Sequence, residues 1–246
     1  MLQPMDTGYM SKISEKLKIV QENINAACVK AGRNPREICL VVVSKSAQLE
    51  AVKEAVDLGF LDLGENHVQQ LKRVSGEIDE LFTTNGQAPP AIRWHMIGHL
   101  QRNKVKQVLP KAHLIHSVDT LRLAEEINSG ATKLNIKSNI LLQVNTSNEP
   151  QKYGVPVGAA THLAEQIETL PHVNLKGLMT MAPLTRNKDV VRACFSRARE
   201  LFVEMRGERI VGPQFTELSM GMSSDYQIAI EEGATILRIG SAIFTG

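Results

Sequence analysis

Six apolar residues, Ile38 to Val43, lead without alternation into Ser44 and Lys45, so an amine follows a buried segment. An unalternated apolar run is typical of a strand buried on both faces, as in a parallel sheet. Such sheets hold ligands at the carboxyl ends of their strands. Apolar surroundings would lower the pKa of Lys45 and make its neutral amine a nucleophile toward an aldehyde. The competing interpretation is a solvated lysine that opens a loop.

Two segments near the C-terminus combine glycine with serine. Residues Ser219 to Asp225 read SMGMSSD, and residues Arg238 to Ser241 read RIGS. Backbone N–H groups at a helix start, small residues and serine hydroxyls together favour an anion. Neither segment is a P-loop or a GxGxxG motif, and a bare Gly/Ser loop can equally be structural. If this cradle shares a mouth with Lys45, its ligand carries a phosphate and an aldehyde, as pyridoxal 5′-phosphate (PLP) does.

The elements that would position these residues alternate along the whole chain. An amphipathic helix over Ser11–Ala31 precedes the first strand, and a helix is expected in each gap between strands. The expected strands are 38–45, 60–63, 92–97, 113–118, 138–144, 173–181, 215–220 and 235–239. Eight such units predict an α/β fold with a single (β/α)₈ TIM barrel, although periodicity alone leaves a doubly wound open sheet possible.

In a barrel, the carboxyl ends of all strands surround one mouth, and the last two loops frequently bind phosphate. Lys45 and the two Gly/Ser segments all fall at that end. Asp119 and Asp225 also fall there, and we expect both to cap helices.

Two rival sites use the histidines and the basic residues. His95 and His99 are four apart, but they leave a strand across Gly98 and no third ligand is evident, so we expect no metal. His113 and His116 would point to opposite faces of a strand. The basic residues near 102–111 form a helix face without interleaved aromatics, which is a poor nucleic-acid patch.

Composition sets broad limits on function. The chain has 246 residues, 43% hydrophobic and 22% charged, with a formal net charge of +2, which gives no reason to expect nucleic acid or membrane as a partner. Three separated cysteines, Cys28, Cys39 and Cys194, indicate reduced thiols and a cytoplasmic protein. No signal peptide or membrane span is expected. We expect one domain over residues 1–246, with residues 1–10 a flexible N-terminus.

Several ordered blocks of residues carry a resemblance to a known family. They are Val43–Lys45, Gly64–Asn66 with Gln69, Trp94–Gln101 with Asn103 and Lys104, Glu149 with Lys152 and Gly154, Gly177–Met179, Leu218–Asp225, and Arg238–Gly240 with Ile243 and Phe244. Over about residues 34–244 the sequence resembles the pyridoxal-phosphate homeostasis protein family. These are single-domain relatives of the N-terminal barrel of alanine racemase, the type III fold of PLP enzymes.

The resemblance implies a PLP cofactor bound covalently to Lys45 as a Schiff base. The implied contacts are Ser223, Gly240 and Ser241 to the phosphate, Arg238 to the pyridine nitrogen, and Asn66 and Met220 to the ring. The sequence departs from the family pattern at Ser241, where threonine is usual, and at Ser46–Gln48, where a basic residue and proline are common. The serine keeps the hydroxyl, whereas the second departure leaves the contribution of the first loop open.

An arginine at the ring nitrogen limits the chemistry that the resemblance implies. A guanidinium keeps its proton and donates to an unprotonated nitrogen, so the ring is a weaker electron sink. Racemases of this fold add a tyrosine from a second domain as the opposite base, and we expect no such domain here. The resemblance therefore implies a cytoplasmic PLP carrier that regulates vitamin B6 and amino-acid and keto-acid pools, without established catalysis. The alternative is a weak amino-acid racemase, or another PLP enzyme of this fold, with its second base from a partner chain.

The expected partners follow from the carrier function. They are PLP and apo forms of PLP-dependent enzymes as recipients, and we expect a monomer. Lys152 falls on a lysine position of the family pattern, in the loop after the fifth strand. We expect it to be a second amine, nearer to solvent than Lys45, that receives the aldehyde during release. The alternative is an ordinary surface lysine with no part in release.

Overall fold

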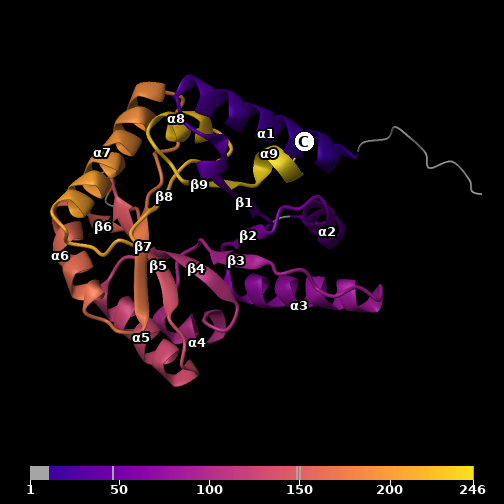
Figure 1. The fold of residues 1–246 in the computed structure, drawn as a ribbon, viewed down its shortest axis with the longest axis horizontal. Helices are drawn as coiled ribbons and strands as arrows, with labels where there is room; N and C mark the ends of the chain where they lie inside the picture. The colour runs from indigo at the N-terminus through magenta and orange to yellow at the C-terminus, as the bar shows by residue number, and fades with distance from the viewer. Residues whose placement is uncertain (1–10, 46, 148, 150, 246) are drawn as a thin grey trace, which may run out of the picture.

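Eight parallel strands close into a barrel in the computed structural model, which describes residues 11–45, 47–147, 149 and 151–245 (Figure 1). The expected flexible segment 1–10 lies outside the described residues. The strands are β1 (Cys39–Val43), β2 (Asp62–Glu65), β3 (Arg93–Met96), β4 (Ala112–Val118), β5 (Ser138–Asn145), β7 (Val173–Met179), β8 (Glu217–Ser219) and β9 (Ile236–Ile239). Their order is β4-β3-β2-β1-β9-β8-β7-β5, and pairing of β4 with β5 closes the ring. The predicted (β/α)₈ barrel is confirmed, and the open doubly wound sheet is excluded.

Helices surround the barrel, one before β1 and one in each gap between strands, as predicted. They are α1 (Lys12–Lys30), α2 (Leu49–Asp57), α3 (Val68–Thr84), α4 (Val105–Val108), α5 (Leu121–Leu134), α6 (Val157–Glu168), α7 (Lys188–Gly207) and α8 (Tyr226–Glu231). The structure adds four short elements that we did not predict: the 3₁₀ turns η1 (Pro35–Glu37) and η2 (Arg102–Lys104), strand β6 (Val155–Pro156) beside β5, and helix α9 (Ser241–Phe244).

Helix α1 shows how the sequence defines these elements. Ser11 caps it, because its side chain accepts the N–H of Ser14 at 3.1 Å. Leu17, Val20 and Ile24 recur at helical spacing and are buried. The helix packs on α8 and α9, so the two ends of the described chain meet on one side of the barrel (Figure 1).

Neither aspartate caps a helix with its side chain. Thr120 caps α5, because its hydroxyl accepts the N–H of Leu123 at 3.3 Å, and the helix thus begins one residue later than Asp119 would allow. Asp225 stands at the N-cap position of α8, but its carboxylate accepts the N–H of Met222 at 2.6 Å. It therefore closes the loop that precedes the helix.

The core has two parts, one on each side of the strands. The larger part lies between the strands and the helices. The smaller part fills the barrel and contains Val41, Leu114, Leu141, Met179 and Ile236. Residues paired in register on neighbouring strands face the same side of a sheet. A polar residue that pairs with one of these five residues therefore also points into the barrel.

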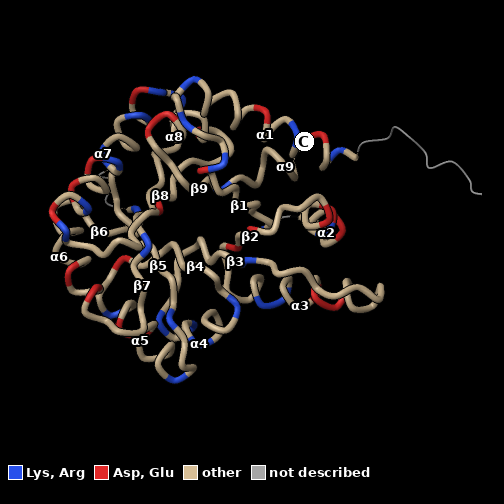
Figure 2. The backbone as a smooth tube through the Cα atoms, viewed as in Figure 1, with Lys and Arg blue, Asp and Glu red and all other residues tan. Residues whose placement is uncertain are grey.

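The surface agrees with the balanced composition. Lys and Arg alternate with Asp and Glu over the outer helices (Figure 2). The three cysteines are free, with Cys28 and Cys194 buried and Cys39 half-buried. In the part of the chain that the structure describes, no helix combines the length and the apolar character that crossing a membrane requires.

Candidate functional site

Lys45 lies in a turn just beyond β1, at the barrel mouth, as predicted. The ladder to β2 continues to the residue before it, since the N–H of Ser44 donates to the carbonyl of Gly64 at 3.1 Å. The Lys45 carbonyl accepts Nε2 of Gln70 at 2.5 Å, which joins the turn to α3. Lys45 is exposed. The residue stands beyond the buried strand and not within it, so solvent reaches its side chain.

Asn66 follows β2 at the same end of the barrel and is half-buried. Its carbonyl lies against Gly98, where a Cβ atom would come within 2.0 Å of the Asn66 oxygen. Only glycine permits this approach, so the loop after β3 fixes the backbone of Asn66.

The loop after β8 places Met220 and Ser223. Met220 is fully buried, and its N–H donates to Ile236 at 3.1 Å. Gly221 has φ +93°, and a Cβ there would lie 2.6 Å from that of Ala229. Its carbonyl accepts the N–H of Arg238 at 3.0 Å. This glycine turn therefore joins the loop after β8 to strand β9.

Ser223, Gly240 and Ser241 come together where the last two loops meet. The Ser223 hydroxyl accepts the N–H of Ala242 at 3.2 Å. Gly240 precedes α9, and a Cβ there would lie 2.9 Å from the carbonyl oxygen of Val43 at the end of β1. Ser241 is exposed at the first position of α9. The two Gly/Ser segments of the sequence thus form one cradle beside the strand that leads to Lys45.

Arg238 points into the barrel, in register with Val41 of β1. Its Nη1 donates to Oγ of Ser219 at 2.6 Å, and its Nη2 donates to the carbonyl of Thr180 at 2.9 Å. Burial lowers the pKa of Arg238 to about 10, against the charge of Asp225, so the side chain remains a cation at neutral pH. A guanidinium has five N–H groups, so these two bonds leave donors available for a ligand.

These residues fit a phosphorylated aldehyde. Lys45 offers an exposed amine, Ser223 and Ser241 offer hydroxyls, and the missing side chain of Gly240 lets a ligand approach the backbone. Arg238 offers a charged hydrogen-bond donor inside the barrel.

Sequence reasoning missed the partners of Arg238 inside the barrel. Ser219 is fully buried and lies 2.9 Å from Nδ1 of His116. His116 in turn lies 2.9 Å from His95, which we weighed above as a metal ligand. One signal was present in the sequence. Leu114 and His116 are two residues apart on β4, so their side chains lie on the same face of the strand, and Leu114 lines the barrel interior.

The histidine pairs do not behave as their spacing suggested. His99 is exposed and stacks on Tyr153, with ring centroids 4.0 Å apart, whereas His95 is buried. The rings of His113 and His116 lie 5.9 and 5.1 Å from that of His95. His113 is exposed, whereas His116 is fully buried. Over the described ranges, no group of three or more His, Cys, Asp or Glu residues could hold a metal ion.

Lys152 differs from its expected setting. It lies in the loop after β5, half-buried, and forms an ion pair with Glu149. The hydrogen bond from Lys152 lowers the pKa of the Glu149 carboxyl. Lys152 is therefore less accessible than Lys45, which reverses the expected order.

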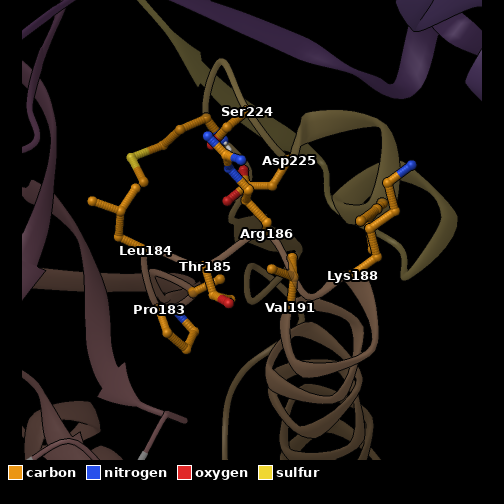
Figure 3. Close-up of a pocket in the computed structure, with 11 residues that line it drawn as sticks. Pro183, Leu184, Thr185, Arg186, Lys188, Val191, Ser224 and Asp225 are labelled. Atoms are coloured by element: carbon orange, nitrogen blue, oxygen red, sulfur yellow. Dashed lines mark hydrogen bonds between the residues drawn. The ribbon is translucent and has the colours of Figure 1, made fainter.

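A cavity of about 650 Å³ adjoins the loop after β8. It is bounded by Pro183 and Leu184 from the loop after β7, by Val191 of α7, and by Ser224 and Asp225 (Figure 3). No residue predicted for the ligand lines it, although two of its lining residues flank Ser223 in the sequence. We place the site at the mouth, because the amine, hydroxyls and guanidinium are there.

Comparison with known proteins gives consistent matches over nearly the whole chain. The family model "Alanine racemase, N-terminal domain" matches residues 16–246. The pyridoxal phosphate homeostasis protein of Aquifex aeolicus is 40% identical and covers 94% of this chain and 96% of that protein. The protein of the same name from Escherichia coli K12 is 36% identical, over 96% of this chain and 97% of that protein. The structure of PipY from Synechococcus elongatus with PLP bound has a TM-score of 0.80 and 32% identity, over 94% of this chain and 99% of the PipY chain.

Proposed function

This chain belongs to the pyridoxal phosphate homeostasis protein family, and on that premise we propose that it binds PLP at the barrel mouth and regulates the supply of free cofactor. Through that supply it controls vitamin B6 and the amino-acid and keto-acid pools that depend on it. A PLP-bound structure of a similar protein, PipY, supports this assignment.

One observation carries the proposal: an exposed amine, a serine–glycine cradle and a buried guanidinium converge on one end of the barrel. When bound, PLP supplies an aldehyde that an amine can attack. We assign that amine to Lys45, which makes the attachment covalent. Ser223, Gly240 and Ser241 hold the phosphate, whereas Asn66 and Met220 line the ring.

Arg238 favours a carrier over a catalyst. Its guanidinium is charged at neutral pH and donates hydrogen bonds, so it stabilises a ring nitrogen that has no proton. A ring in this form withdraws electrons weakly, which disfavours chemistry at a bound amino acid. The names of the curated relatives, which describe homeostasis and no reaction, agree with a regulatory function.

Delivery to apo-enzymes, a monomeric state and a cytoplasmic location remain predictions, as does the single-domain organisation. Each of them follows from the sequence and needs its own measurement.

Absorbance spectroscopy tests the proposal directly. The purified chain with added PLP should gain the absorbance band of a protein-bound adduct. Borohydride should reduce this adduct to a stable covalent one at a single site, which mass spectrometry should locate on Lys45. Lys45→Ala should lose the fixable adduct and keep the parent's circular dichroism, with Lys152→Ala as the matched lysine control. A single stoichiometric adduct on the Lys45→Ala protein would refute the attachment, and failure of the parent to bind PLP would refute the function.

A further inference from the structure

Five side chains form one continuous polar chain across the interior of the barrel. From Arg238 of β9, the chain runs through Ser219 of β8, His116 of β4 and His95 of β3 to Asp62 of β2. The successive distances are 2.6 Å, 2.9 Å, 2.9 Å and 3.1 Å. Strands β8 and β4 are not neighbours in the barrel. The contact between Ser219 and His116 therefore bridges the interior.

The direction of these hydrogen bonds follows from the end at Asp62. The hydrogen bonds that Asp62 accepts from His95 and Arg93 lower its pKa well below the ordinary range, although its partial burial acts in the opposite sense. An ionised carboxylate only accepts, so Nε2 of His95 carries the proton. Arg93 holds the same carboxylate through two bonds, from Nε and Nη2.

With both histidine rings neutral, the direction of each remaining hydrogen bond is fixed. A neutral His95 with its proton on Nε2 has Nδ1 as an acceptor, so His116 donates from Nε2. By the same rule, Nδ1 of a neutral His116 is an acceptor, and the Ser219 hydroxyl donates to it. The hydroxyl oxygen is left to accept from Arg238, which can only donate. All four bonds point from Arg238 toward Asp62.

The surroundings favour a neutral His116. His116 is fully buried, and His95 is 2% exposed. Burial lowers the pKa of His116, and the nearby His95, Arg238 and His113 lower it further. The reverse direction would need His95 to donate from both ring nitrogens, to Asp62 and to His116, and therefore to be charged.

Within the described residues, Arg238 has no carboxylate in direct contact, since the charge of Asp225 acts on it only from beyond ion-pair distance. Among the described side chains, no carboxylate forms an ion pair with Arg238, which is only 4% exposed. A buried charge is stable only when hydrogen bonds compensate its lost hydration. The polar chain provides that compensation and ends on a carboxylate.

We propose that Asp62, His95, His116 and Ser219 are positioning residues that form one directed hydrogen-bond relay and hold Arg238 as a charged donor toward the ring nitrogen of PLP. This inference rests on the proposed function, and it extends the site from the mouth into the barrel interior. Ser219 is the contact through which the relay acts on Arg238.

The first test uses the chain without PLP. Two-bond ¹H–¹⁵N spectra at pH 7.5 of protein with ¹⁵N-labelled histidine distinguish the two neutral tautomers, and single substitutions assign the signals. We expect both His95 and His116 to carry the proton on Nε2, with the exposed His162 as a reference for a solvated ring. A proton on Nδ1 of His116, or a charged ring at either position, would overturn the relay.

The second test compares PLP with its carbocyclic analogue, in which the ring nitrogen is replaced by C–H. Ser219→Ala should weaken PLP binding about tenfold, as for loss of a hydrogen bond to a charged group, and should change binding of the analogue less than twofold. Ser117→Ala is the matched control, because that buried hydroxyl on β4 donates to the carbonyl of Gly98 and lies outside the relay. It should not separate the two ligands.

Equal weakening of both ligands by Ser219→Ala, or of neither, would show that Ser219 has only a structural role. If that variant does not fold, Asp62→Asn decides: it keeps an acceptor but removes the charge, and should weaken PLP about threefold while sparing the analogue. An unchanged ratio would overturn the proposal. Failure of the parent to bind PLP refutes the proposed function and the role toward the ring, while the tautomer spectra still decide the direction of the relay.

Discussion

Ser44 and Glu65 share a hydrogen bond of 2.6 Å between Oγ and Oε1 at the ends of β1 and β2, where both side chains are buried. The bond lies directly before Lys45 and Asn66 in the sequence, so it joins the two loops that carry them. In the described part of the chain, the second oxygen of Glu65 is buried without a hydrogen-bond partner. Ser44 supplies the side-chain hydrogen bond to this buried carboxyl.

Ser44→Ala should destabilise the fold by about 1–3 kcal/mol, because it leaves a buried acceptor without its donor. Urea unfolding followed by circular dichroism measures the change. Ser129→Ala, on the exposed side of α5, is the control and should stay within about 0.5 kcal/mol of the parent. Equal stability of Ser44→Ala and the parent would show that the bond contributes nothing.

Glu65→Gln should leave the protein as stable as the parent, or more stable, at pH 8. Burial raises the pKa of Glu65, against the opposing effects of Ser44, the Asn66 N–H and Arg73. A raised pKa means that its stabilisation is complete below the unfolded value of 4.5 and is lost as the pH rises through the folded value. Glutamine keeps the amide oxygen for Ser44 and cannot ionise.

Unfolding curves at pH 4 and pH 8 check this sign. The advantage of Glu65→Gln should grow with pH and vanish near pH 4. A variant that loses more stability at pH 8 than at pH 4 would contradict the assignment of a destabilised carboxylate.

The parent should lose stability as the pH falls below about 6.5, because burial lowers the pKa of His116 well below that ordinary value. The unfolded chain then binds more protons than the folded chain, so stability is complete above the unfolded pKa and falls below it. Urea unfolding at pH 7.5, 6.5 and 5.5 measures the slope. His116→Gln should flatten it. An unaltered slope in His116→Gln would show that this ring does not titrate on unfolding.

Lys152→Ala should leave the Lys45 adduct spectrum unchanged and slow the transfer of PLP to an added apo-enzyme. Lys152 lies at the same end of the barrel as Lys45 and is paired with Glu149, so Glu149→Gln should free the amine and speed the transfer. Stopped-flow recovery of apo-enzyme activity measures both rates. Transfer at the parent rate in both variants would remove Lys152 from the release step, and racemisation of an amino acid above the rate of free PLP would contradict the carrier function.

The local features of this protein follow from its sequence. An unbroken apolar run identified β1, the alternation of strands and helices predicted the barrel, and barrel geometry placed Lys45 and both Gly/Ser segments at one mouth. These inferences succeed because hydrophobic periodicity and chain order act over short separations. The short elements β6 and α9 escaped prediction, because two to four residues are too few to show a period.

Contacts across the barrel were decided only by the tertiary structure. Alternation along β4 shows that His116 faces inward, but its partner Ser219 lies 103 residues away on a strand that is not its neighbour. Which inward residues meet depends on the closure and stagger of the strands, which a single sequence does not reveal. The exposure of Lys45 and the pairing of Lys152 with Glu149 depend in the same way on where each loop leaves the barrel.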